Sequence, residues 1–152
     1  MGERMLIKSI LIFVVMLGFA YGEQTWLTNF DDALDKAQQE EKTLLLYFSG
    51  SDWCRPCILL KKNVFETEEF KNFAEENLIL AMFDFPAHEE NQLEPDQIEH
   101  NEKMAELYNP KGNFPHIVLI SAKGEKIAEF AGYNGESATK YIAKLQKELT
   151  TK

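Results

Sequence analysis

Short runs of consecutive apolar residues alternate with longer stretches in which apolar residues recur every three or four positions. Uninterrupted apolar runs bounded by turn residues are typical of strands buried on both faces, whereas the wider spacing is typical of amphipathic helices. The pattern predicts strands over residues 43–48, 78–83, 116–120 and 126–130. It predicts helices over residues 30–41, 54–63, 97–108 and 137–149, and a further short helix after Thr67.

The connections between these elements predict how the strands pair. The early strands are joined through helices, which favours parallel pairing because a parallel partner needs a crossover connection. The last two strands are joined by the tight turn at residues 122–124, which requires antiparallel pairing. The prediction is an α/β fold with a four-stranded mixed sheet and helices on both faces. Residues 85–96, which contain two prolines and several acidic residues, are expected to form an exposed loop.

The length and the net charge of the chain exclude some classes of architecture and of partner. A chain of 152 residues leaves little room for a second domain. The formal net charge of −9 argues against nucleic acid or an anionic membrane surface as a partner, because both would be repelled.

Residues 1–22 have the pattern of a secretory signal peptide. Two basic residues precede the apolar run of residues 10–17, which is too short to span a membrane comfortably, and small residues end the segment. We expect cleavage before Glu23, which leaves residues 23–152 as the folded domain; a retained membrane anchor is the alternative. The protein is therefore expected to be exported, to the periplasm in a Gram-negative bacterium, and to meet a membrane only through this segment if it is uncleaved.

Cys54 and Cys57 are the only cysteines of the chain, and they directly follow the first predicted strand and its turn. A strand that leads into a Cys-x-x-Cys at the start of a helix is the layout of a dithiol–disulfide redox centre. A structural disulfide is the alternative in an exported protein, but so small a loop constrains the unfolded chain little. The spacing therefore favours a redox-active Cys54–Cys57 disulfide.

Three features of the sequence resemble the thioredoxin family. The run Trp53-Cys54-Arg55-Pro56-Cys57 is similar to the family's Trp-Cys-x-x-Cys after a buried strand. Phe114-Pro115-His116 precedes the third strand, where the family places a cis-proline that faces the redox pair. The hairpin ends in Phe130-Ala131-Gly132-Tyr133, similar to the family's glycine after its last strand. The match covers residues 28–150, and the Cys54 region is also similar to the C-terminal domain of bacterial transmembrane disulfide reductases.

The resemblance implies a thioredoxin fold and assigns a role to each cysteine. Cys54, at the helix start, is the expected nucleophile that forms a mixed disulfide with the partner, and Cys57 is expected to resolve it. Helix N–H groups and the nearby Arg55 favour the thiolate; thiols in such sites have pKa values of about 3.5–7.5, against about 8.5 for a free thiol.

The expected substrate-binding residues are Trp53, Arg55, Pro56, Phe114 and Pro115. Pro115 is expected to hold a cis bond that exposes backbone groups of Phe114 to a substrate strand. A solvated surface role for Arg55 and a core position for Trp53 are the alternatives. The implied partners are protein thiols and disulfides, with an upstream electron donor or acceptor protein, and we expect a monomer.

One family feature is missing from the sequence. Cytosolic thioredoxins carry a buried aspartate under the redox pair, which assists proton transfer. The matching position here falls on Tyr47 or Phe48, and neither side chain can act as that base.

Two questions about function remain open from the sequence: whether the protein reduces or oxidises its partners, and whether it is an enzyme or a binding module. Pro56 is shared with reducing members of the family, so a reductase is favoured over an oxidant. A non-catalytic binding module or chaperone with the same fold is the rival hypothesis. No cofactor other than the cysteine pair is expected. His88, His100 and His116 lack paired spacing, so no metal site is expected; His116 should pack in the core, and the other two should be solvated.

Overall fold

The computed structural model describes residues 24–150, so the predicted signal segment, residues 1–22, lies outside the described part of the chain. The strands are β1 (Trp26–Leu27), β2 (Thr43–Ser49), β3 (Leu78–Asp84), β4 (His116–Ile120) and β5 (Lys126–Ala131). The helices are α1 (Phe30–Glu40), α2 (Arg55–Leu60), α3 (Glu68–Asn77), α4 (Pro95–Tyr108) and α5 (Ala138–Leu149), with a π-helical segment η1 (Lys61–Phe65) and a 3-10 turn η2 (Glu89–Asn91). Between residues 24 and 150, no helix has the length and apolar character needed to cross a membrane.

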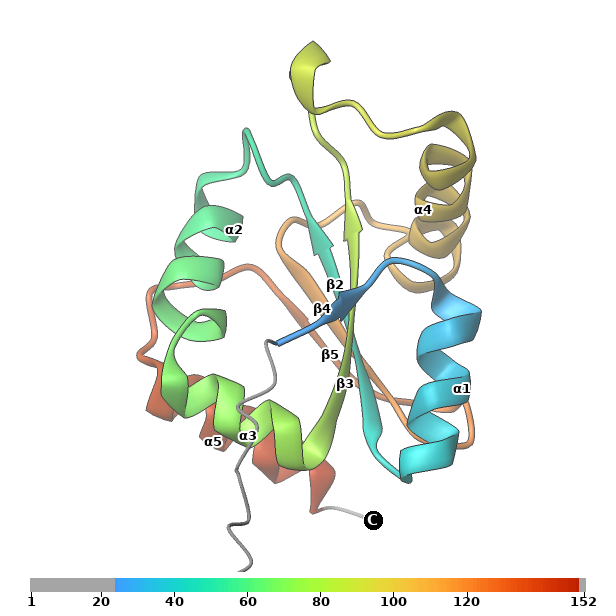
Figure 1. Ribbon diagram of the computed structural model, residues 1–152. Coiled ribbons are helices and arrows are strands. Elements are labelled where there is room, and N and C mark those ends of the chain that lie inside the picture. Colours follow the sequence, from blue (N-terminus) through green and yellow to red (C-terminus); the bar gives the residue numbers. More distant parts are fainter. Residues whose placement is uncertain (1–23, 151–152) are drawn as a thin grey trace, which may run out of the picture.

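The strands form one mixed sheet in the order β1-β3-β2-β4-β5. Strands β1 and β2 both run parallel to β3, whereas β4 runs antiparallel to β2 and to β5. Helices α2, α3 and α5 cover one face of the sheet, and α1 and α4 cover the other (Figure 1). The predicted α/β class and the mixed sheet with helices on both faces are confirmed.

Two details of the predicted sheet were wrong. The sheet has five strands and not four, because β1 was missed. With two residues it is too short to give a periodic pattern, and only its pairing with β3 defines it. Strand β4 follows a helix but is antiparallel to β2. The reason is that α4 stays near the end of the sheet where β3 finishes, so β4 starts from that same end (Figure 1).

Strand β2 lies at the centre of the sheet and divides the core into two layers. Alternate side chains of a strand point to opposite faces. Leu45 and Tyr47 pack on the side of α2, α3 and α5, whereas Leu46 and Phe48 pack on the side of α1 and α4. Every residue of β2 is buried, which explains why its sequence is a continuous apolar run.

The segment after the cysteines continues further than predicted. Cys54 is the N-cap of α2, and the helix passes directly into η1 and ends at Phe65, beyond the predicted end at residue 63. Thr67 then caps α3 as its sequence indicates, accepting a hydrogen bond from the N–H of Phe70. Helix α4 begins at Pro95, two residues before its predicted start, because proline suits the first turn of a helix. The predicted loop is correspondingly shorter and contains η2.

An aromatic cluster fixes this helical segment against the sheet. The ring centroid of Phe65 lies 5.2 Å from that of Trp26, 5.1 Å from that of Tyr47 and 4.8 Å from that of Phe70. The ring also forms a T-shaped pair with Tyr141 of α5, with 6.1 Å between the ring centroids. Phe65 therefore joins β1, β2, α3 and α5 at one buried point.

Replacing Phe65 by alanine should destabilise the protein by about 3–5 kcal/mol, because the lost ring leaves a cavity that four rigid neighbours cannot fill. The measurement is urea unfolding monitored by circular dichroism. Leu107→Ala is the matched control, since Leu107 is exposed on α4. Its effect should stay within about 0.5 kcal/mol. Equal effects of the two substitutions would contradict the assigned role of Phe65.

Candidate active site

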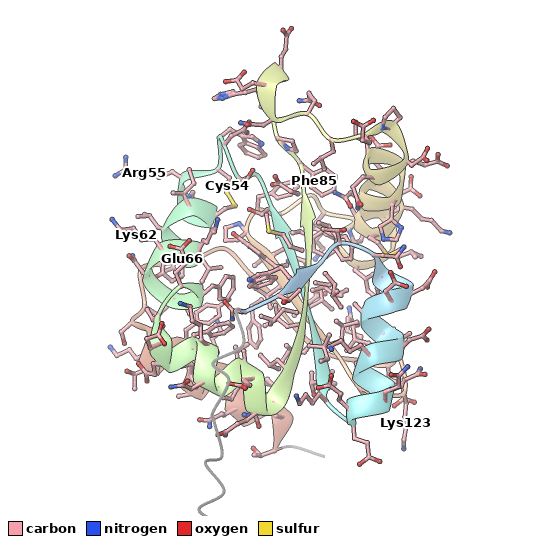
Figure 2. The ribbon with its side chains drawn as sticks, viewed as in Figure 1. Cys54, Arg55, Lys62, Glu66, Phe85 and Lys123 are labelled. Atoms are coloured by element: carbon pink, nitrogen blue, oxygen red, sulfur yellow. A yellow bond between two sulfur atoms is a disulfide. The ribbon has the colours of Figure 1, made fainter. Side chains whose placement is uncertain are left out.

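Cys54 and Cys57 form a disulfide at the start of α2, with 5.2 Å between their Cα atoms (Figure 2). Both residues are buried; Cys54 is 4% exposed and Cys57 1%. The Sγ of Cys54 accepts a hydrogen bond from the backbone N–H of Cys57 at 3.3 Å. The first N–H groups of a helix lack partners within the helix and carry partial positive charge. The arrangement therefore favours negative charge on Cys54 once the disulfide is opened.

Trp53 lies on the surface beside the disulfide and is 49% exposed, so the structure does not place it in the core. Its indole Nε1 donates a hydrogen bond to the carbonyl of Phe85 at 2.7 Å. The indole ring lies against Gly50, where an added Cβ would come within 2.3 Å of the ring atom Cε2. Gly50 is therefore required for the position of Trp53.

Phe114 and Pro115 approach the site from the start of β4. The Phe114–Pro115 peptide bond is cis, and the carbonyl of Pro115 accepts the N–H of Gly132 at 2.8 Å. The ring of Phe114 lies edge-on to Trp53 at 5.5 Å and to Phe85 at 5.4 Å. These three aromatic side chains form a continuous apolar border from residues far apart in the sequence.

Arg55 and Pro56 are exposed on α2. Pro56 lies in the first turn, where a missing N–H removes no helical hydrogen bond. Arg55 points away from the sheet and from the disulfide in Figure 2. The structure thus brings Trp53 and Phe114 together, whereas Arg55 and Pro56 lie on the outer surface of the redox helix.

Asp52 is a structural residue of the site that the sequence reasoning missed. Its carboxylate accepts hydrogen bonds from the N–H groups of Ala87 at 2.9 Å and His88 at 3.0 Å, and from the side-chain amide of Asn91 at 3.0 Å. These donors, the N–H of Ala87 foremost, lower the pKa of Asp52 to about 2. Asp52 therefore fixes the loop after β3 to the turn that precedes Trp53.

Asp84 makes a second connection between the same two segments. It is the last residue of β3, and its carboxylate accepts hydrogen bonds from both the backbone N–H and the hydroxyl of Ser51. Ser49 and Asp84 are also paired in register across β2 and β3. The turn before the cysteines is thus held by two carboxylates, neither of which touches the sulfur atoms.

Tyr47, and not Phe48, is the side chain that faces the redox helix. Its hydroxyl donates a hydrogen bond to the carbonyl of Cys57 at 3.1 Å and accepts one from the hydroxyl of Ser49 at 3.1 Å. Burial raises the pKa of Tyr47 to about 12, so the phenol remains protonated and serves as a donor. A cavity of about 340 Å³ lies next to Tyr47 and Cys57 and is lined also by Lys62.

The three histidines have separate environments. His116 is buried, and burial lowers its pKa. His88 is exposed near Asp52. His100 was predicted to be solvated, but it is partly buried and accepts the N–H of Phe30 at 3.1 Å, because α4 packs beside the start of α1. Within residues 24–150, no group of three or more histidine, cysteine or acidic side chains could hold a metal ion.

A search of protein families matches the model described as thioredoxin-like over residues 25–122. The chain belongs to the thioredoxin-like family. A curated relative from Chlamydia pneumoniae, named disulfide bond reductase DsbH, is 31% identical over 121 residues, which cover 80% of this chain and 70% of the relative. Thioredoxin-related protein DsbJ of the same organism is 25% identical over 117 residues, covering 75% of this chain and 32% of that protein.

Solved structures agree with the family. A structure titled DsbH oxidoreductase superimposes with a TM-score of 0.77 at 27% identity, covering all of this chain and 96% of the other. The reduced C-terminal domain of DsbD from Neisseria meningitidis has a TM-score of 0.54 at 20% identity, covering 78% of this chain and 92% of the other, which supports the fold alone. The predicted thioredoxin fold is confirmed.

The substitution Asp52→Asn should weaken the attachment of the loop after β3. The pKa of Asp52 is lowered from 3.8 to about 2 in the folded protein, so its contribution is fully present above pH 3.8 and is lost as pH falls through about 2. The stability difference between wild type and variant should therefore be constant near neutral pH and shrink below pH 3.8. Urea unfolding at pH 7, 4 and 2.5 measures it.

Hydrogen exchange at the amides of Ala87 and His88 provides a local readout, which should speed up in Asp52→Asn at pH 7. Asp35→Asn is the control, because Asp35 is exposed on α1 and accepts no side-chain hydrogen bond among the described residues. A stability difference that persists unchanged at pH 2.5 would contradict the assigned role of Asp52.

Tyr47→Phe should destabilise the protein by about 1–2 kcal/mol, because the buried hydroxyl of Ser49 loses its acceptor. Adding Ser49→Ala should then cost less than the two single effects combined, since no buried hydroxyl remains unsatisfied. A double-mutant cycle from urea unfolding measures this coupling. Additive single effects would show that the two hydroxyls act independently.

Proposed function

We propose that the protein is an exported thiol–disulfide oxidoreductase that reduces disulfides of partner proteins through Cys54 and Cys57. The observation that carries the proposal is the position of Cys54, whose Sγ accepts the N–H of Cys57 at the start of α2. The half-exposed ring of Trp53 and the neighbouring Phe114 offer a partner chain an apolar surface beside this sulfur. The amino-terminal sequence pattern supports export.

The reaction balances two electrons and two protons. In the reduced protein, Cys54 loses its proton to the solvent, its thiolate attacks one sulfur of the partner's disulfide, and the partner's other sulfur leaves as a thiolate that takes up a proton from the solvent. Cys57 then gives up its proton and attacks Cys54. The mixed disulfide breaks, the partner is released as a dithiol, and the Cys54–Cys57 disulfide forms. A second protein must return two electrons before the next cycle.

Two observations favour reduction over oxidation. Pro56 is the second residue between the cysteines, as in reducing members of the family that the sequence resembles. The relative from Chlamydia pneumoniae, 31% identical, is named a disulfide bond reductase. Stabilisation of the Cys54 thiolate favours the reduced form and so acts in the opposite direction, which makes the reduction potential the quantity to measure.

The proposal predicts that the protein accelerates insulin reduction when dithiothreitol supplies electrons. Cys54 should titrate well below about 8.5, the pKa of a free thiol, because the helix amides stabilise its thiolate. Absorbance of the thiolate at 240 nm across a pH series, measured on Cys57→Ser, gives that pKa.

Single cysteine variants separate the roles of the two sulfurs. Cys57→Ser should accumulate mixed disulfides with partner proteins through Cys54, whereas Cys54→Ser should accumulate few because Cys57 is the more buried residue. Insulin turnover no faster than dithiothreitol alone, with both cysteines intact and reduced, would favour the rival hypothesis of a binding module.

A further inference from the structure

The outer face of the redox helix combines apolar and cationic side chains. Trp53, Ile58 and Leu59 are 49%, 45% and 37% exposed, and they are three of the four large exposed hydrophobic residues in the described part of the chain. Arg55, Leu59 and Lys62 are spaced by four and three residues, which places them along one helical face. Large exposed apolar side chains gathered beside a reactive group are typical of a surface that binds a partner.

In the described part of the chain, the two cations of this face are not held in ion pairs, unlike the neighbouring Lys61. Lys61 forms an ion pair with Glu66 at 3.7 Å, but across residues 24–150 neither Arg55 nor Lys62 forms one. Figure 2 shows both side chains directed away from the sheet. In a chain of net charge −9, unpaired cations on the outer face of the helical segment that follows the cysteines are a local reversal of the protein's overall charge.

The loop on the opposite side of the disulfide carries negative charge. The loop after β3 contains Glu89, Glu90 and Glu94, all exposed. Hydrogen bonds from this loop to Asp52 and from Trp53 to the loop fix it beside the cysteine turn. Figure 1 shows η2 projecting beyond the end of β3, separate from α2. A partner chain that approaches Cys54 therefore meets cations on one side and carboxylates on the other.

A hollow lies at the edge of the cationic side. The cavity of about 340 Å³ beside Cys57 is bordered by Ile58 and Met82 together with Lys61 and Lys62. Glu66 also lines it, but its carboxylate pairs with Lys61 at 3.7 Å, which leaves Lys62 as the unpaired cation. The cavity therefore favours an apolar side chain of the partner protein. Acidic residues next to that side chain in the partner are favoured by the nearby ammonium group.

We propose that this surface, formed by Arg55, Ile58, Leu59 and Lys62, selects protein substrates whose disulfide lies next to an acidic and apolar segment. The inference rests on the proposed reductase function and specifies its substrate class. At an ionic strength of about 0.1 M, charges more than about 10 Å apart are largely screened. A segment that docks on this face lies closest to Arg55 and Lys62, so these cations act on it more strongly than carboxylates on other faces do, although the net charge alone would predict repulsion of an acidic partner.

The test uses two disulfide-linked peptides that differ only in the charged residues flanking one cysteine, Glu-Leu in one and Lys-Leu in the other. Reduction of each by the protein with dithiothreitol gives kcat/KM. At about 0.1 M salt, the acidic peptide should be favoured by roughly tenfold, and the preference should fall to about twofold at 0.5 M salt.

Charge reversal at one position locates the effect. Lys62→Glu should lower the acidic-to-basic ratio by roughly fivefold or more, since it replaces attraction with repulsion. The ratio cancels any change in the reactivity of Cys54, because both peptides meet the same thiolate. Lys123→Glu is the matched control: Lys123 is also exposed, and it lies at the opposite end of the molecule from Cys54 (Figure 2). It should change the ratio less than twofold.

Ile58→Ser tests the apolar part of the surface and should lower kcat/KM for both peptides alike. Equal kcat/KM for the two peptides while insulin is still reduced would overturn the inference and leave the reductase function intact. An equal loss of preference in Lys62→Glu and Lys123→Glu would also overturn it, because the preference would then reflect net charge. Failure to reduce insulin or either peptide would overturn the reductase function, and the inference with it.

Discussion

The hydrogen bond from the N–H of Cys57 to the Sγ of Cys54 is the contact on which the proposed chemistry depends. It exists because Cys54 is the N-cap of α2 and so faces amides that the helix cannot satisfy itself. Tyr47 of β2 fixes the position of the helix start, because its hydroxyl donates a hydrogen bond to the carbonyl of Cys57. The aromatic contacts of Phe65 hold the other end of the same helical segment.

The substitution of tyrosine for the family's buried aspartate changes what the strand can contribute. A carboxylate under the redox pair can accept a proton, whereas the phenol of Tyr47 holds its proton to a pKa of about 12. Tyr47 therefore positions the start of the helix through its hydrogen bond to the carbonyl of Cys57, and it does not supply a base. Cys57 borders a cavity lined by Ser49, Lys61 and Glu66, so polar groups are available on that side of the helix.

The parts of the molecule that the sequence predicted are those specified by local patterns. The buried run of β2 and the Cys-x-x-Cys spacing each lie within a few consecutive residues, so periodicity and motif suffice. Strand β1 has two residues and is defined only by pairing with β3. The three hydrogen bonds of Asp52 reach residues 35 to 39 positions away. No pattern within one segment can reveal a carboxylate whose donors lie in another loop, nor that α4 leaves β4 antiparallel to β2.

The same long-range contacts give the active-site surface its asymmetry of charge. If the acidic loop after β3 were free to move, its negative charge would not be confined to one side of the disulfide. Asp52 and Trp53 fix it at one edge of the disulfide, whereas Arg55 and Lys62 lie on the outer face of the helical segment that follows the cysteines (Figure 2). The net charge sets the electrostatic potential far from the protein. A partner chain that has docked is affected mainly by charges within about one Debye length, because salt screens the others. Two fixed regions of opposite sign can therefore orient an incoming chain even though the whole protein is acidic.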